Sequence, residues 1–250
     1  MTDASDAHTA MTSLKGRRIV VTGGTTGIGR AIAVLLASEG AKLHICGRDP
    51  QHLQDALDRI AQVGDGQGTS IDLAEDGAVP RYFDDAVAAL GGLDVAVINA
   101  AIGAEGLTDM GADDLRYAIA TDFTAYLTSA HAAIEKGATD LVLIGSMSAH
   151  VLGPGSTVYA GIKAGIAGFA EALRREVGPK GVRVSLLEPG KAGSDMQLPD
   201  ISAEEQRRMI RDQTMLRAED IAVGVHYILT QPQRTVVQQL TIVPRDQEGE

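Results

Sequence analysis

The sequence has few features of an extracellular, nucleic-acid-binding or membrane protein. Only one of its 250 residues, Cys46, is a cysteine, so no disulfide can form within the chain, and a reducing compartment is favoured. The 22 Lys and Arg residues are outnumbered by 33 Asp and Glu residues, and the formal charge of −11 argues against binding to nucleic acids or anionic membranes. No apolar run reaches the roughly 18 residues that a membrane-spanning helix needs. We therefore expect a cytoplasmic protein.

Large aromatic residues are also scarce, with no Trp and three Phe. Because 44% of the residues are hydrophobic, the chain can still bury a core, made mainly of Ala, Val, Ile and Leu. The polar residues 1–13 lack the apolar stretch of a signal peptide and are expected to form a flexible tail. Since no linker or repeat divides the rest, we predict one domain over residues 14–245 and a short tail over 246–250.

Short apolar segments alternate with stretches of helical pattern along the chain. The segments predicted to be strands are 18–22, 42–46, 68–72, 94–99, 141–145, 182–187 and 238–243. One helix is predicted to begin at Asp49-Pro50, an N-cap residue followed by Pro at the first helical position. This alternation predicts an α/β fold of the Rossmann type, with a doubly wound, mostly parallel seven-stranded sheet and helices on both faces.

A glycine-rich turn, VVTGGTTGIGR (20–30), joins the first predicted strand to a helix. Gly23, Gly27 and Gly29 have the spacing G-x-x-x-G-x-G, which lets a phosphate approach the backbone closely. The helix N-terminus then offers free N–H groups and a positive dipole end to a pyrophosphate. The alternative is a turn that only packs helix on strand, but the strand–loop–helix context favours a dinucleotide site.

The end of the second predicted strand indicates which dinucleotide would bind. Many dinucleotide folds carry an acid here that binds the adenosine ribose and selects NAD. This chain has Gly47 and then Arg48, whose guanidinium can pair with a 2′-phosphate. We expect NADP(H) to be favoured, with NAD(H) as the alternative; Arg48 as a solvated strand-end residue is the competing interpretation.

The segment SMSAHVLGPGSTVYAGIK (146–163) places Tyr159 and Lys163 four residues apart. On a helix such residues share a face. A free phenol titrates near pH 10, and a nearby ammonium makes its anion easier to form, so the pair could transfer a proton near neutral pH. Ser146, thirteen residues before Tyr159, could donate a hydrogen bond to a substrate oxygen; Ser148 is the rival hydroxyl. His150 is interpreted as a packing or solvated loop residue, with a substrate contact in the pocket as the alternative.

Together, the segments TGGTTGIG, SIDL, VINAAIG, YAGIK and EPGKAGSDM resemble the short-chain dehydrogenase/reductase family over about residues 15–245. The resemblance implies contacts to adenine from SIDL, a cofactor-binding segment after the fourth strand, and a Pro-Gly segment over the nicotinamide. The residues assigned in this way to the cofactor are Gly23, Thr25, Thr26, Gly27, Ile28, Gly29, Arg48, Asp72, Leu73, Asn99, Ala100, Ala101, Tyr159, Lys163, Pro189, Gly190, Ala192 and Ser194.

The resemblance also implies the catalytic residues Ser146, Tyr159 and Lys163, and it places Asp122 where the family has an Asn thought to hold a proton-relay water. An Asp can accept from such a water, but its charge would favour protonated Lys163 and oppose tyrosinate formation. Three interpretations remain open: a working variant, an altered pH optimum, or lost catalysis.

We therefore predict an oxidoreductase that transfers a hydride between NADP(H) and a small carbonyl or alcohol substrate, with Tyr159 as proton donor and acceptor and without a metal ion. Residues 194–216 would form the substrate lid. A homotetramer or homodimer is implied by the resemblance alone. The alternatives are a catalytically silent dinucleotide-binding sensor or subunit, and a family member that performs dehydration or epimerisation.

Overall fold

Parallel strand pairing organises the protein, whose computed structural model describes residues 11–198 and 200–246. The strands are β1 (Arg18–Val21), β2 (Lys42–Gly47), β3 (Asp65–Ser70), β4 (Val95–Ile98), β5 (Asp140–Ile144), β6 (Arg183–Pro189) and β7 (Gln239–Ile242). They form one sheet in the order β3-β2-β1-β4-β5-β6-β7, and every neighbouring pair is parallel. The order reverses between β1 and β4, where ligands bind in such sheets.

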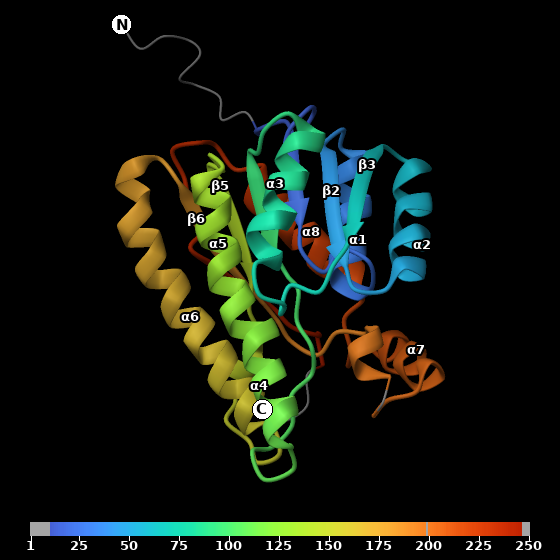
Figure 1. Cartoon of the computed structure of the whole chain (residues 1–250). Coiled ribbons are helices and arrows are strands. Elements are labelled where there is room, and N and C mark those ends of the chain that lie inside the picture. Colours follow the sequence, from blue (N-terminus) through green and yellow to red (C-terminus); the bar gives the residue numbers. More distant parts are fainter. Residues whose placement is uncertain (1–10, 199, 247–250) are drawn as a thin grey trace, which may run out of the picture.

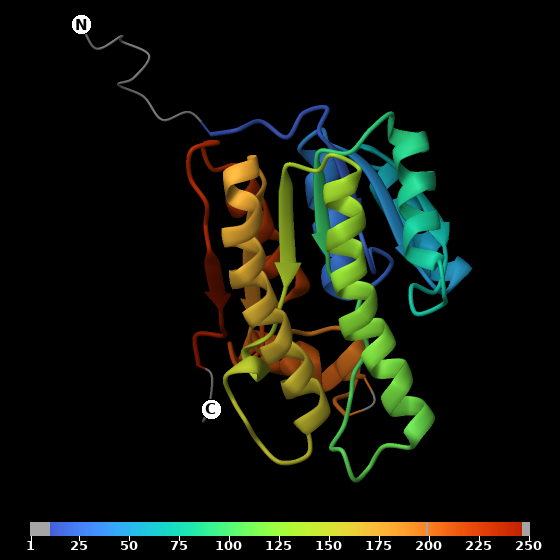
Figure 2. The same ribbon diagram turned by 60° about the vertical axis from the view of Figure 1, so that its left-hand side comes forward.

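The helices lie on both faces of this sheet, as predicted (Figure 1). Their bounds are α1 (Gly27–Ser38), α2 (Pro50–Ala61), α3 (Ala78–Leu90), α4 (Ala112–Ile119), α5 (Ala125–Glu135), α6 (Thr157–Val177), α7 (Ala203–Arg211) and α8 (Ala218–Leu229). A π-helical turn, Ala120–Thr124, connects α4 to α5 in one long helical path beside α6 (Figure 2). No helix within the described ranges is long and apolar enough to cross a membrane.

Alternation along the strands divides the core into two layers. In β1, Ile19 and Val21 pack with α1, α2 and α8, whereas Val20 packs on the opposite face with α3, α5 and α6. Successive strand side chains point to opposite faces, so strands covered on both sides are apolar throughout. This explains why the central strands appear in the sequence as continuous apolar runs, such as β4 and β5.

The third strand differs most from its prediction, since it spans Asp65–Ser70 instead of 68–72. Its sequence, DGQGTS, carries almost no apolar signal, and its pairing with β2 determines its position. A Cβ atom at Gly66 would lie 2.7 Å from Ile60, and one at Gly68 would lie 2.7 Å from Leu53. The glycines therefore leave room for side chains of α2 against this edge strand.

Hydrogen bonds hold both ends of the described part of the chain. Residues 1–10 and 247–250 of the two predicted tails lie outside the described residues. Thr12, in the predicted N-terminal tail, donates from its backbone N–H to the carbonyl of Thr230 (2.8 Å) and from its hydroxyl to the carbonyl of Gln231 (2.9 Å). Asp246 likewise donates its N–H to the carbonyl of Gln213. The single-domain division stays a prediction.

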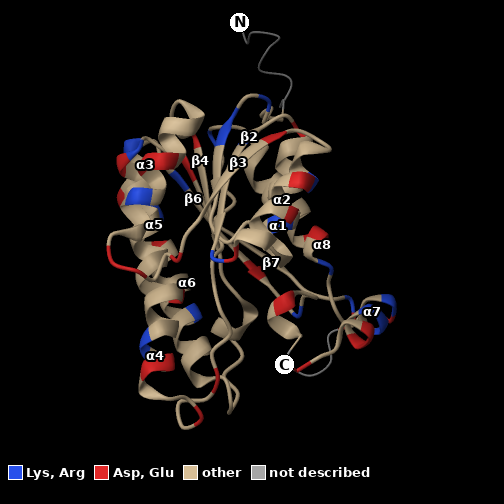
Figure 3. Cartoon of the chain, turned by 45° about the vertical axis from the view of Figure 1, so that its right-hand side comes forward, with Lys and Arg blue, Asp and Glu red and all other residues tan. Residues whose placement is uncertain are grey.

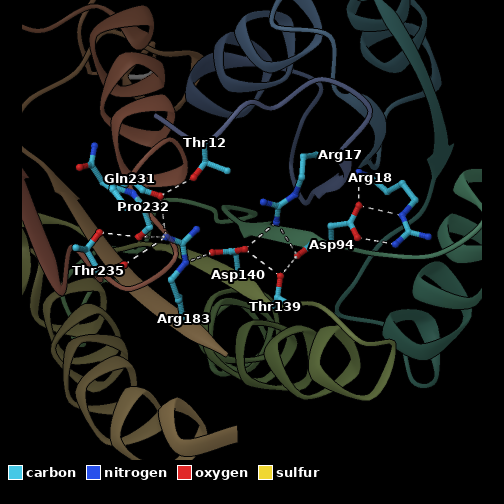
Figure 4. A network of polar contacts seen from close by, with 10 residues as sticks. All are labelled: Thr12, Arg17, Arg18, Asp94, Thr139, Asp140, Arg183, Gln231, Pro232 and Thr235. Carbon is cyan, nitrogen blue, oxygen red and sulfur yellow. Dashed lines mark hydrogen bonds and ion pairs between the residues drawn. The ribbon is translucent and has the colours of Figure 1, made fainter. Parts of the chain in front are cut away.

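A buried ionic network joins the amino ends of the strands, opposite the end of the sheet that carries the candidate site (Figure 4). Asp140 accepts from Arg17 (2.7 Å) and from Arg183, and its side chain is only 4% exposed. Arg183 also donates to the carbonyls of Gln231, Pro232 and Thr235. Because a buried carboxylate must be paired to be tolerated, this network is structural.

Candidate active site

The glycine-rich turn lies against the segment that follows β4. Asn99 donates from its side chain to the carbonyls of Thr22 and Gly23, both at 3.1 Å. Gly23 has a φ of 64°, and a Cβ atom there would lie 2.7 Å from the Cα of Ala100. A Cβ atom at Gly29 would lie 2.0 Å from the carbonyl oxygen of Gly23. These two glycines are therefore required for packing as well as for any approach of a phosphate.

Buried Thr22, which the sequence analysis did not identify, holds this junction together. Its hydroxyl accepts from the backbone N–H groups of Asn99 (2.9 Å) and Ala100 (3.1 Å), and its own N–H donates to the carbonyl of Val97. The carboxyl ends of β1 and β4 are thus tied together at the point where the strand order reverses. In the sequence, only the position of Thr22 directly before Gly23 could have indicated this role.

The Pro-Gly segment, which begins at the last residue of β6, reaches the same place. The N–H of Gly190 donates to the carbonyl of Ile242, and Ala192 and Leu216 form a parallel bridge. A Cβ atom at Gly27 would lie 3.3 Å from the Cβ of Ser194, so the glycine turn and the predicted carboxamide-contact residue face one another. The arrangement brings together two segments that are far apart in the chain.

The predicted adenosine-binding end includes a contact that the sequence analysis missed. A Cβ atom at Gly47 would lie 2.3 Å from the hydroxyl of Thr25, so no acidic side chain fits at this position without displacing Thr25. Arg48, which follows it, donates to the hydroxyl of Tyr117. Tyr117 in turn donates to the carboxylate of Asp72 across 2.6 Å. Arg48 is therefore not simply a solvated strand-end residue.

Tyr159 and Lys163 lie on one face of α6, as their spacing predicts. The Lys163 ammonium is 5.4 Å from the centroid of the Tyr159 ring and 5.5 Å from that of Tyr126. It donates to the carbonyl of Ile144 at the end of β5 (3.3 Å), and the residue is only 2% exposed. A buried ammonium needs such partners because few water molecules reach it.

Tyr126 completes this environment, although the sequence analysis gave it no role. Its ring is buried beside Lys163, and its hydroxyl donates to the same Ile144 carbonyl across 2.7 Å. Burial raises its pKa well above the ordinary value, so the hydroxyl keeps its proton and remains a donor. The Tyr126 hydroxyl on α5 and the Lys163 ammonium on α6 are thus both held by the carbonyl of Ile144 at the end of β5. Tyr126 lies one helical turn after Asp122, which was the only sequence signal.

Asp122 lies at the centre of the π-helical turn and is completely buried. One carboxylate oxygen accepts from the backbone N–H of Ile102 (2.7 Å), while the other has no hydrogen-bond partner. Burial raises the pKa of this carboxyl to about 6, against the opposing effects of the Ile102 hydrogen bond and of the charge on Lys163. Single π turns inside α-helices are frequent at functional sites.

The loop after β5 carries both candidate serines. The hydroxyl of Ser146 accepts from the N–H of Ser148 and donates to the hydroxyl of Ser148, both at 3.1 Å. His150 is held by Glu188, whose side chain is fully buried in β6 and also accepts from Gln239. His150 is therefore a partner of a buried carboxylate, although its own side chain remains 47% exposed to solvent.

The predicted lid contains α7. Arg208 pairs with Glu205, and acidic and basic residues lie side by side on this helix (Figure 3). Gln206 donates to the carbonyls of Ser194 (3.2 Å) and Ile201 (3.0 Å), which ties α7 back to the Pro-Gly segment. A groove between α1, α7 and α8 reaches the glycine turn. Residue 199 of the lid lies outside the described residues.

Comparison with known proteins identifies the family. The family model described as short chain dehydrogenase matches residues 17–205, which is more than half of the chain.

The chain belongs to the short chain dehydrogenase family.

Several members of the family resemble the chain over nearly its whole length. An uncharacterized oxidoreductase from Staphylococcus aureus (strain MRSA252) is 32% identical over 240 residues, covering 94% of this chain and 100% of the relative. Sulfoacetaldehyde reductase 2 from Chromohalobacter salexigens is 29% identical over 238 residues, covering 92% of this chain and 94% of the relative.

The fold is also that of solved short chain dehydrogenases. A dehydrogenase/reductase from Sinorhizobium meliloti 1021 superimposes with a TM-score of 0.82 at 32% identity, covering 92% of this chain and 94% of that structure. A short chain dehydrogenase from Burkholderia cenocepacia J2315, solved in complex with NADP, has a TM-score of 0.82 at 31% identity, covering 93% and 98%. These likenesses confirm the Rossmann-type fold predicted from the sequence.

The residues present fit a dinucleotide of the kind that this family uses. Gly23 and Gly29 pack the turn tightly against the residues after β4, and α1 begins within this turn at Gly27. The N-terminus of α1 offers the positive dipole end and the N–H groups that a pyrophosphate binds. Thr26 precedes that helix without capping it through its side chain, so its first N–H groups are not taken by a capping hydroxyl. The predicted nicotinamide-contact residue Ser194 faces Gly27 at the same end of the sheet.

Proposed function

We propose that this short chain dehydrogenase is an NADP(H)-dependent oxidoreductase that interconverts a small carbonyl compound and its alcohol. The observation that carries the proposal is the buried Lys163 ammonium, held between the rings of Tyr126 and Tyr159 and one helical turn from Tyr159. Such an ammonium stabilises the anionic form of a neighbouring phenol. A phenol that can give up and regain its proton is what carbonyl reduction and alcohol oxidation require.

The proton-transfer roles follow from this placement. When bound, NADP(H) supplies or accepts the hydride. In reduction the Tyr159 hydroxyl donates its proton to the substrate oxygen, and in oxidation it takes that proton back. Ser146, at the carboxyl end of β5, donates a hydrogen bond to the same oxygen as negative charge develops there. Of the two loop hydroxyls, Ser146 also receives the N–H of Ser148, which fixes its position.

The preference for NADP(H) rests on Gly47 and Arg48. Thr25 fills the space in which an acidic side chain at position 47 would repel a 2′-phosphate, and Arg48 supplies a guanidinium beside it. The complex of the Burkholderia relative with NADP supports the same preference. The predicted roles of Asp72 toward adenine and of Asn99, Pro189 and the other cofactor residues remain part of this proposal.

The substrate is proposed to be a small aldehyde or ketone. Met196 and Leu198 of the predicted lid expose their apolar side chains, 39% and 44% respectively, next to the Pro-Gly segment. Because one relative is named a sulfoacetaldehyde reductase, anionic aldehydes belong among the compounds to be tested. A cytoplasmic location and a homodimer or homotetramer also remain proposals.

The decisive experiment combines cofactor titration with a substrate screen. The emission of the reduced nicotinamide reports binding of both cofactors directly. We expect tighter binding of NADPH than of NADH, and NADPH oxidation with at least one member of a panel of aldehydes, ketones, keto acids and sulfoacetaldehyde. Equal or tighter NADH binding would contradict the cofactor preference, and binding without turnover across the panel would favour the silent dinucleotide-binding alternative.

A further inference from the structure

Three elements meet at the hydroxyl of Tyr117, a residue of α4. Arg48, just after β2, donates to this hydroxyl through Nη1, and its Cζ lies 5.7 Å from the centroid of the Tyr117 ring. Tyr117 donates to Oδ2 of Asp72, just after β3, across 2.6 Å. The other oxygen of Asp72 accepts from the backbone N–H of Ala74 (2.9 Å). The phenol therefore connects a guanidinium to a carboxylate that is itself fixed.

The charges of its partners determine the direction of both hydrogen bonds. An ionised carboxylate can only accept and a guanidinium can only donate, so the phenol must donate to Asp72 and accept from Arg48. Partial burial and the hydrogen bond to Asp72 raise the pKa of Tyr117, so its hydroxyl is protonated at neutral pH. Hydrogen bonds therefore run from the Arg48 guanidinium to the Tyr117 hydroxyl and from that hydroxyl to the Asp72 carboxylate.

Arg48 needs such a tether because it is otherwise an exposed, flexible side chain. Its backbone carbonyl accepts from Ser70 (2.9 Å), which fixes the main chain and leaves the long side chain to be ordered. A guanidinium has five N–H donors in a planar fork, and Tyr117 uses only one of them. The remaining donors can pair with a phosphate while the Tyr117 contact persists.

We propose that Tyr117 is a specificity-determining residue for the cofactor, whose hydroxyl holds the Arg48 guanidinium where it binds the 2′-phosphate of NADP(H). This inference rests on the proposed NADP(H) dependence and adds to it a residue from a helix far from β2 in the chain. Ordering Arg48 before binding reduces the entropy lost when the phosphate is bound. Since NADH lacks this phosphate, its affinity should hardly depend on the Tyr117 hydroxyl.

A double-mutant cycle of Tyr117→Phe and Arg48→Ala tests this coupling through the dissociation constants of NADPH and NADH. We expect Tyr117→Phe, which keeps the ring but removes the hydroxyl, to weaken NADPH binding by about three- to tenfold, the usual size for one lost hydrogen bond. NADH binding should change by less than about twofold. In the Arg48→Ala background, Tyr117→Phe should have no further effect on NADPH binding.

Tyr227→Phe is the matched control, because Tyr227 is half exposed on α8, whereas the side chains of Arg48 and Asp72 form their hydrogen bonds with Tyr117. Equal weakening of NADPH and NADH by Tyr117→Phe, no change with either, or persistence of its full effect without Arg48 would overturn the proposed role. Tighter binding of both cofactors would also overturn it, since the phenol would then obstruct the adenosine site.

The outcome separates this inference from the proposed function. If wild-type protein prefers NADPH and Arg48→Ala removes that preference, but Tyr117→Phe leaves it intact, only the role of Tyr117 fails. If wild-type protein shows no NADPH preference, or if Arg48→Ala leaves NADPH binding unchanged, the proposed cofactor preference fails together with the role of Tyr117.

Discussion

The Asp122 carboxylate accepts a hydrogen bond from the backbone N–H of Ile102 across 2.7 Å, and its second oxygen is buried without a hydrogen-bond partner. Asp122 thus makes one hydrogen bond, while its buried negative charge is only partly compensated by hydrogen bonding. Asparagine would retain an oxygen for Ile102 and carry no charge, so the two residues can be compared at this position without loss of the observed hydrogen bond. Two predictions follow from this difference.

We expect Asp122→Asn to stabilise the protein at neutral pH. Burial raises the carboxyl pKa from 3.8 to about 6, so between these values the unfolded chain releases a proton that the folded chain retains. Wild-type stability therefore falls as the pH rises through this window, by up to about 3 kcal/mol, and the loss persists above it. Urea denaturation should show the Asn variant about 1 to 3 kcal/mol more stable at pH 7.5, with the two proteins converging toward pH 4. A difference independent of pH would contradict the argument.

The same substitution should shift the pH dependence of alcohol oxidation. Asp122 and Lys163 attract each other, so the carboxylate favours the protonated ammonium and opposes formation of a tyrosinate at Tyr159. Removing the anion should move the acidic limb of the kcat/KM profile to lower pH while the enzyme stays active. Superimposable profiles would show that Asp122 does not influence proton transfer, and an inactive Asn variant would show that the carboxylate itself is required.

Tyr159→Phe should abolish turnover and spare cofactor binding. The phenol is the proposed proton donor, and losing a general acid typically costs about 10² to 10⁴ in rate. Lys163 keeps its bond to the Ile144 carbonyl in this variant, and the glycine turn is untouched. NADPH titration and steady-state rates measure the two properties separately. Retention of most of the wild-type rate would mean that the proton comes from another group, with Ser146 the first candidate.

Arg48→Asp should shift the cofactor preference toward NADH. The substitution removes the proposed partner of the 2′-phosphate and adds a carboxylate that repels it and can accept from a ribose hydroxyl. We expect the ratio of NADPH to NADH dissociation constants to rise by at least about tenfold, a change of about 1.4 kcal/mol in relative binding. Arg59→Asp, on the exposed surface of α2, is a control for the change in net charge alone.

Asp140→Asn should strongly destabilise the fold without changing the catalytic properties of the folded enzyme. The carboxylate pairs with Arg17 and Arg183 at the amino ends of the strands, opposite the candidate site, and it is almost fully buried. Removing one partner of a buried ionic pair typically costs about 3 to 5 kcal/mol. Asp55→Asn breaks an exposed pairing with Arg30 and Arg59 and should cost less than about 1 kcal/mol. Equal effects in urea denaturation would contradict the assignment of Asp140 as a structural anchor.

Much of the fold and the candidate site could be predicted because the relevant signals are local. Six of the seven strands lie within two residues of their predicted bounds, and the glycine turn follows the first of them directly. Helical spacing alone places Tyr159 and Lys163 on one face. The N-cap at Asp49 was predicted correctly for the same reason, since its carboxylate accepts from the N–H groups of Gln51 and His52. Each of these features depends on residues within a few positions of one another.

Packing between distant segments decided the rest. The third strand, poor in apolar residues, takes its position from β2 and not from its own pattern. Tyr117 lies 45 residues from Asp72 and 69 from Arg48 in the chain, and Tyr126 shares a carbonyl with Lys163 only because α5 and α6 cover the same face of the sheet. Such contacts have no signature in sequence spacing, because they exist only after the sheet has brought the strand ends together. The sequence by itself determined which groups are available and which neighbours share a helix face, and the tertiary structure determined the partners that position them.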